Sequence, residues 1–301
     1  MSSPEKRTTH APANVVMGTY ATSRSPDQGV RIAYDKEILR NGWLLVDTWV
    51  PALILCSAYV STVKVFLPRY MKDRPPLDIM SFIRAFNLFQ VLANFWFAIQ
   101  VGRRTYFGGS FSWLCQGVMG RDDPVTLDLL RLLYVYIWVR VVDLLDTVFF
   151  GLRHKWTHVS TLNVSHHCIV LLFGVYGVRH GADSHMTLVV LVNQCVHVIM
   201  FTYYFFASFG DRFRKYLTWK RYLTGIQLAQ FFVLGVHSVL PLVFPCPGLP
   251  AMHSIVAISS MTFFFIMFAR FYVQTYGGVK QELSKIPVSF GCKLLVENKS
   301  L

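Results

Sequence analysis

Histidine and amide side chains share one face of an otherwise apolar stretch at residues 162–181. Asn163, His166 and His167 stand three and four residues apart, a spacing that places all three along one stripe of a helix. Imidazole is the side chain whose ordinary pKa lies nearest neutrality, so it can act as an acid, a base or an acyl acceptor. The stripe therefore predicts a site for such chemistry, although one buried histidine alone is more often structural.

Three further apolar stretches each contribute one polar face. Singly, each face has an ordinary explanation: an ion pair, interfacial aromatic residues, or hydrogen bonds between helices. Helices that bury polar faces together, however, enclose a wet or ligand-filled cavity, so the set predicts a transmembrane active site. Its residues are Arg140, Asp143, Asp146 and Thr147 in residues 125–150; Asn193, His197, Tyr203 and Tyr204 in residues 186–208; and Thr224, Gln227 and Gln230 in residues 221–245.

The composition places these stretches in a membrane. The 301-residue chain is 53% hydrophobic and 15% charged, whereas soluble domains carry about 25% charged residues. A membrane span needs about 20 mostly apolar residues. The sequence therefore predicts an all-α, polytopic integral membrane protein with about seven transmembrane helices, at residues 44–67, 79–101, 125–150, 162–181, 186–208, 221–245 and 251–275.

Two tails flank this predicted membrane domain of residues 44–275. Lys and Arg concentrate in one alternate set of loops and in residues 276–301, which predicts a basic, cytosolic C-terminal tail and a polar, lumenal N-terminal tail of residues 1–43. The net charge of +13 is explained by this bias and by anionic headgroups, so the predicted partners are lipid and acidic substrates rather than nucleic acid. Pro68, Pro75 and Pro76 are expected to break the chain after the first span.

The cysteines carry no chemistry in this interpretation. Cys56, Cys168 and Cys195 fall within predicted spans, where they are expected to be small core residues. Cys115 and Cys246 both fall in loops on the predicted lumenal face, where an oxidising compartment permits a disulfide.

Several motifs in this order resemble the ELO family, the elongases of very long chain fatty acids. Residues 140–147, Arg-Val-Val-Asp-Leu-Leu-Asp-Thr, are similar to the family's Lys-x-x-Glu-x-x-Asp-Thr, and residues 163–167, Asn-Val-Ser-His-His, to its His-x-x-His-His box. Residues 193–204 resemble Asn-Ser-x-Val-His-x-x-Met-Tyr-x-Tyr-Tyr, and Thr224, Gln227, Gln230 and Phe231 match the family pattern fully. Upstream, residues 68–77 and Asn87-Leu88 resemble two further family segments.

The resemblance implies a condensing enzyme of the endoplasmic reticulum membrane. Such an enzyme joins a fatty acyl-CoA to malonyl-CoA and releases CO2 and CoA, giving a 3-ketoacyl-CoA, with no cofactor or metal beyond these substrates. His166 and His197 are then the expected catalytic pair, oriented by His167, Asn163 and Asn193. The implied partners are the ketoreductase, dehydratase and enoyl reductase of the elongation cycle.

The substrate-binding set implied by the resemblance contains most other members of the polar faces and two cations from the loop after the first span. Arg140, Lys72 and Arg74 are the cations expected to meet CoA phosphates. The acyl chain is expected in a channel enclosed by the helices. The remaining expected substrate-binding residues are Asp143, Asp146, Asn163, Asn193, Tyr203, Tyr204, Gln227 and Gln230.

Two departures from the family pattern bear on the chemistry. Asn163 stands where the family has its first histidine, which exchanges a proton-transfer group for an amide that only hydrogen-bonds. Arg140 and Asp143 keep the charges of the family's Lys and Glu but change their reach. Activity survives the first change if that position only orients its neighbours.

Two other functions compete with the elongase interpretation. A membrane di-iron desaturase or hydroxylase holds its metal with clustered histidines, and His154 and His158 with the pair at 166–167 imitate part of that pattern, but no second His-His pair occurs. A seven-helix transporter or receptor also encloses a polar cavity. The histidine stripe argues against it, as does the lack of an inverted repeat.

Overall fold

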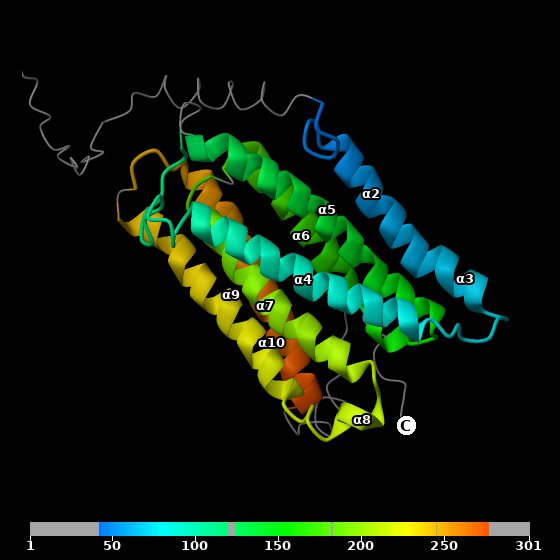
Figure 1. Ribbon diagram of the computed structural model, residues 1–301. Coiled ribbons are helices and arrows are strands. Elements are labelled where there is room, and N and C mark those ends of the chain that lie inside the picture. The colour runs from blue at the N-terminus through cyan, green and yellow to red at the C-terminus, as the bar shows by residue number, and fades with distance from the viewer. Residues whose placement is uncertain (1–41, 120–123, 182, 245, 277–301) are drawn as a thin grey trace, which may run out of the picture.

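The computed structural model describes residues 42–119, 124–181, 183–244 and 246–276, and all regular structure within these ranges is helical. The tails expected at residues 1–43 and 276–301 fall almost wholly outside the described residues. Long helices run side by side and form an elongated bundle (Figure 1). They are α2 (Val50–Ser61), η1 (Thr62–Phe66) and α3 (Leu67–Met71) in continuation, α4 (Met80–Arg104), α5 (Pro124–Leu152), α6 (Thr161–His180), α7 (Thr187–Ala207), α9 (Lys220–Val243) and α10 (Ala251–Tyr276).

Six of these helices are long and apolar enough to cross a membrane: Val50–Met71, α4, α6, α7, α9 and α10. The remaining expected span is α5, whose 29 residues rise about 43 Å, more than a hydrocarbon layer of about 30 Å. Its charges separate it from the other six, because Arg140, Asp143 and Asp146 lie within it. The expected multi-span fold is confirmed, and α5, the long helix with the most charged residues, carries one of the four predicted polar faces.

The first span continues through Pro68, which was expected to break it. Thr62–Phe66 form a π-helical turn, in which the Leu67 N–H donates to the Thr62 carbonyl. Proline lacks an N–H and crowds the carbonyl four residues earlier, and one wider turn relieves both conflicts without ending the helix. The chain leaves the helix after Met71, so that Pro75 and Pro76 lie in the loop before α4.

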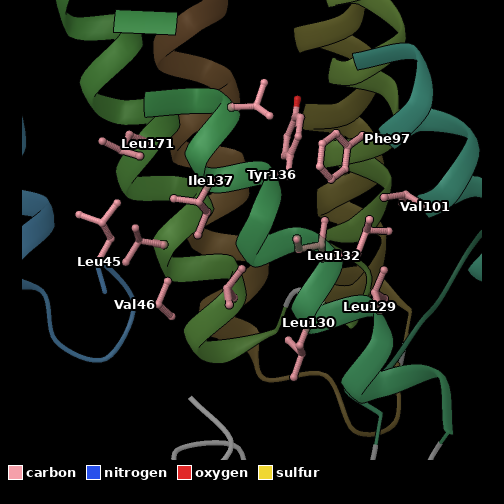
Figure 2. Packing of buried hydrophobic residues seen from close by; sticks show 14 of the residues in the cluster. Leu45, Val46, Phe97, Val101, Leu129, Leu130, Leu132, Tyr136, Ile137 and Leu171 are labelled. Carbon is pink, nitrogen blue, oxygen red and sulfur yellow. The ribbon is translucent and has the colours of Figure 1, made fainter. Parts of the chain in front are cut away.

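The apolar core is built around α5. Leu129, Leu132 and Ile137 of α5 pack with Phe97 of α4 and Leu171 of α6, and Figure 2 shows these side chains between the helices. α4 also packs along α7, and α9 along α10. Large apolar side chains on the outside of the bundle, such as Phe82 and Phe232, remain exposed as a lipid-facing surface requires.

Three loops interlock at the end of the bundle where α4 ends and α10 begins. The Val118 N–H donates to Gly248 O, and the His185 N–H donates to Gln116 O. A Cβ at Gly117 would lie 2.3 Å from Pro247 O, so only glycine lets these loops approach so closely. Cys115 and Cys246 form a disulfide within this cap, as the assignment of both residues to one face suggested.

Thiol labelling tests the disulfide. In denatured, unreduced protein we expect peptides containing Cys56, Cys168 and Cys195 to be alkylated, because their thiols are free, and those containing Cys115 and Cys246 to be protected. Reductant should expose the protected pair, as read by peptide mass spectrometry. Alkylation of Cys115 before reduction would contradict the pairing.

Candidate active site

A buried arginine organises the polar cluster in the middle of the bundle. Arg140 on α5 is 4% exposed, and its Nη1 lies 2.8 Å from Nδ1 of His197 on α7. Its Nη2 donates to Oδ1 of Asn94 on α4 at 2.8 Å, and Asp143 lies 3.0 Å away, one turn along α5. The guanidinium also stands 4.6 Å over the ring of Tyr136. The guanidinium thus links α4, α5 and α7, and its partner on α7 is the imidazole of His197.

This contact fixes the protonation state of His197. Arginine has only donors, so Nδ1 of His197 must accept, and the neutral ring then carries its proton on Nε2. His197 is 7% exposed and its ring packs against Phe201, with centroids 5.7 Å apart. His166 and His167 of α6 lie close enough to interact electrostatically with His197.

Sequence reasoning missed the two amides of α4 that complete this cluster. Asn94 Nδ2 donates to the backbone carbonyl oxygen of Gln90 at 2.7 Å and to the side-chain Oε1 of Gln90 at 3.1 Å. The hydroxyl of Tyr136 donates to Asn94 Oδ1 at 3.2 Å. Both amides are fully buried. The available signal was two amides four residues apart on one face of an apolar helix.

The adjacent histidines of α6 face different neighbours. His166 lines the main cavity and packs against Phe264 of α10, with ring centroids 4.9 Å apart. His167 meets the edge of Tyr59 of α2, with centroids 6.2 Å apart. Neither His166 Nδ1 nor His167 Nε2 has a hydrogen-bond partner among the described residues, and both atoms are buried. Of these two histidines, only His166 therefore borders the cavity.

Asn163 belongs to a second network, formed by α2, α5 and α6. Its Nδ2 donates to Thr147 Oγ1 at 3.0 Å, and the Tyr59 hydroxyl donates to the same oxygen at 2.7 Å. Ser160 caps α6 by accepting from the Asn163 N–H. Asn163 does not line the main cavity. The amide therefore ties helices together one turn away from His166 and His167.

The other predicted site residues are divided between the cavity and the bundle's edges. Asn193 and Gln230 line the cavity together with Arg140 and His166. Gln227 instead donates to Met200 Sδ at 3.4 Å. Asp146 lies close enough to interact electrostatically with Asp143 and Tyr204. Tyr203 points to the loop after α7, where its hydroxyl donates to Leu217 O.

A narrow cavity of about 70 Å³ begins at this polar cluster and continues between apolar side chains. It passes from His166 to Val178 along α6, about 18 Å at 1.5 Å per residue. Val170, Phe173 and Val189 line its middle, and Met186 lies at its far end. A reactive, polar end and a long apolar body suit a ligand with one reactive group and an apolar chain.

Cations gather near the end of the bundle opposite the disulfide cap. Burial, and then Lys220 and Lys155, lower the pKa of His158, which lies in η2 (Trp156–His158) between α5 and α6. Lys64 donates to Val159 O at 2.7 Å. Lys72 and Arg74 are exposed in the loop before α4, and Arg74 stacks on Tyr70 at 4.1 Å. Arg140, in contrast, is enclosed by protein partners and is not among these cations.

Within the described residues, no group of three or more His, Cys, Asp or Glu side chains is arranged to hold a metal ion. The di-iron alternative requires clusters of histidine ligands. His197 instead contacts the guanidinium of Arg140, and His166 lines the cavity together with that arginine.

Several known proteins with similar sequences are named very long chain fatty acid elongases. A very long chain fatty acid elongase of Aedes aegypti is 34% identical over 239 residues, which are 79% of this chain and 66% of that protein. Very long chain fatty acid elongase 4 of Macaca mulatta is 35% identical over 242 residues, 80% of this chain and 76% of that protein. The elongase 4 of Mus musculus is 33% identical over 258 residues, 86% of this chain and 82% of that protein.

The family match covers the whole helical bundle. Residues 44–284 match the ELO family, described as the GNS1/SUR4 family. This span includes the four polar faces, the cavity and the disulfide cap. The chain therefore belongs to the ELO family.

Proposed function

We propose that this protein is a very-long-chain fatty acid elongase that condenses a fatty acyl-CoA with malonyl-CoA. One observation carries the proposal: an apolar cavity ends at His166, beside the guanidinium that holds His197. Acyl transfer needs a nucleophile that is neutral near pH 7 and a channel for the tail. The cavity and imidazole supply both, and the names of the relatives point to the same reaction.

The proposed reaction is a decarboxylative condensation carried by the imidazole pair. One of His166 and His197 accepts the acyl group from the thioester, and the other assists. Loss of CO2 from malonyl-CoA then supplies the carbon nucleophile that takes the acyl group, giving a 3-ketoacyl-CoA. Both substrates are CoA thioesters, and the proposed chemistry uses no further cofactor or metal.

The proposed setting is the membrane of the endoplasmic reticulum, with a lumenal N-terminal tail and a cytosolic C-terminal tail. The Cys115–Cys246 disulfide supports a lumenal assignment for its end of the bundle, because such bonds persist in oxidising compartments. Lys155 and Lys220 near the opposite end are suited to meet CoA phosphates, together with Lys72 and Arg74. The proposed partners are the ketoreductase, dehydratase and enoyl reductase of the elongation cycle.

Removing either imidazole of the pair should abolish the reaction. In microsomes, His166→Ala and His197→Ala are each expected to reduce incorporation of radiolabelled malonyl units at least about 100-fold, since acid–base and nucleophilic groups contribute factors of this size. Immunoblotting should show unchanged protein abundance. Substantial activity in both variants would refute the assignment.

The Asn163 network yields a different expectation. Asn163→His should keep activity within about threefold, because imidazole can also donate to Thr147 and the position lies outside the cavity. Asn163→Leu should lower thermal stability by about 1 kcal/mol, the usual net value of one hydrogen bond. Initial rates and thermal unfolding of purified protein check both values. A more than tenfold rate increase in Asn163→His would mean that the position takes part in the chemistry.

The cavity predicts a determinant of chain length at Gly174, two turns along α6 from His166. A Cβ there would meet Ile137 at 3.7 Å, an ordinary contact, so Gly174→Ala should leave the product profile unchanged. Gly174→Leu should fill part of the cavity and shorten the longest product by about one elongation cycle. Fatty-acid profiling in an elongase-deficient yeast measures this. An unaltered profile in an active Gly174→Leu enzyme would show that the tail lies elsewhere.

A further inference from the structure

We propose that Gln230 of α9 binds the carbonyl oxygen of the acyl thioester through its amide N–H group, and that this contact stabilises the oxyanion formed during acyl transfer. The inference rests on the proposed function, and it names the part of the substrate that Gln230 contacts. Gln230 lines the cavity, so in this assignment it touches the reacting carbonyl group itself and does not act through a neighbouring residue.

Gln230 carries a buried amide that the protein leaves open to the cavity. The residue is only 6% exposed, and no described residue forms a hydrogen bond with its amide. Gln227, one turn earlier on α9, instead donates to Met200 Sδ at 3.4 Å. A buried amide without a partner destabilises a fold. A ligand that brings a hydrogen-bond acceptor into the cavity would remove this cost.

Aromatic side chains of α10 place Gln230 at the same height in the bundle as His166. Phe264 packs against His166 of α6 with ring centroids 4.9 Å apart, and against Phe231 of α9 at 5.4 Å. Phe268 also meets both rings, at 5.9 and 5.1 Å. Phe231 directly follows Gln230 in the chain. The amide therefore lies at the reactive end of the cavity and not beside its apolar body.

The thioester carbonyl is the group of the proposed substrate that suits an uncharged donor at this place. The acyl tail has no polar atoms, and the CoA phosphates carry charges that suit cations such as Lys155 and Lys220 near the end of the bundle. The carbonyl oxygen accepts hydrogen bonds, and it must lie close to an imidazole of the proposed pair for the acyl group to be transferred. A primary amide supplies N–H donors without a charge.

The contact strengthens as the reaction proceeds. The lone pair of one imidazole forms a bond to the carbonyl carbon, and the π pair of the C=O bond moves onto the oxygen. This oxygen then carries negative charge, so it accepts the Gln230 N–H more strongly than the ground-state carbonyl does. The C=O bond re-forms and the C–S bond breaks, with its electron pair on the CoA sulfur. That thiolate takes the proton that the acylated imidazole loses.

Two unreactive substrate analogues test the contact. In the first, CH2 replaces the thioester sulfur of an acyl-CoA, which leaves a ketone. In the second, CH2 replaces the carbonyl group as well, and the rest of the molecule is identical. Wild-type protein should bind the ketone about 3- to 10-fold more tightly, the usual range for one hydrogen bond. In Gln230→Leu this affinity ratio should fall toward one, and kcat for the acyl-CoA should fall about 100-fold, as loss of an oxyanion donor does.

Thermal stability separates a ligand contact from a structural role. Gln230→Leu replaces an unpartnered buried amide by an apolar side chain of similar size, so the unfolding midpoint of the ligand-free protein should rise by about 2 °C or more. A fall in the midpoint would mean that the amide holds the fold together, which would overturn the inference.

Two further measurements cover a Leu variant that fails to accumulate. Gln230→Met, which keeps the unbranched shape of the side chain, carries the same tests. In wild-type protein, the infrared stretch of a 13C-labelled carbonyl in the bound ketone should lie at lower wavenumber than in a hydrocarbon solvent. An unshifted stretch would contradict the proposed hydrogen bond.

A glutamine with a protein partner provides the matched control. Gln100 on α4 does not line the cavity, and its Oε1 accepts from Arg104 Nη1 at 2.6 Å. Gln100→Leu should lower the unfolding midpoint, because it removes a satisfied hydrogen bond. It should leave kcat and the affinity ratio of the two analogues unchanged.

The outcomes separate this inference from the function beneath it. A wild-type enzyme that forms no malonyl-CoA-dependent product would refute the proposed function and the inference with it. An active wild type whose Gln230→Leu variant keeps full kcat would overturn only the inference. Equal weakening of both analogues in that variant would overturn it as well, because the amide would then contact a part of CoA that both analogues share.

Discussion

A guanidinium placed in the middle of a membrane bundle must be satisfied by protein. An arginine at this depth costs about 2.5–3.5 kcal/mol on insertion scales, and Arg140 offsets that cost with an amide, a carboxylate, an imidazole and an aromatic ring. These partners come from α4, α5 and α7. Removing one leaves a buried donor unpaired, a loss of about 1–3 kcal/mol or more for a charged group. The packing of three helices and the state of one catalytic imidazole are therefore coupled.

A second polar network connects the remaining wall of the site. Thr147 of α5 accepts from Tyr59 of α2 and from Asn163 of α6, which fixes how α6 lies against α5. His166 follows Asn163 by three residues, so this network sets the height and rotation of its imidazole. Two networks that share α5 thus place His166 at one end of an apolar cavity and hold His197 against Arg140, which lines the same end. The interlocked loops and the disulfide close the other end of the bundle.

The sequence revealed most of the helices, because long apolar runs indicate membrane spans. It also revealed much of the chemistry, because histidines within such spans are rare and usually functional. Hydropathy located every described long helix, and the charges of α5 were visible as residues 140–146. The sequence did not show which side chains would be the partners of Arg140. Asn94 and Gln90 carry no titratable group, and nothing in their spacing shows that a guanidinium from α5 meets them. That Arg140 meets a CoA phosphate stays a prediction, whereas its contacts with Asn94, Asp143 and His197 are ones that only the packed bundle brings together.

Two smaller differences have the same origin. Adjacent residues of a helix point about 100° apart, so His166 borders the cavity while His167 packs on Tyr59. Pro68 reads as a helix breaker, yet a π-helical turn carries α2 past it. In each case the sequence supplied the residue, and the neighbouring helix or turn decided its role.

The most direct measurement is an experimental structure of the protein with a non-hydrolysable acyl-CoA analogue that keeps the carbonyl. The account predicts that the carbonyl lies at the polar end of the cavity, within reach of His166 and His197, and that the tail follows the cavity toward Met186. An analogue whose carbonyl sits away from both histidines, or whose tail runs along the lipid-facing surface, would contradict it.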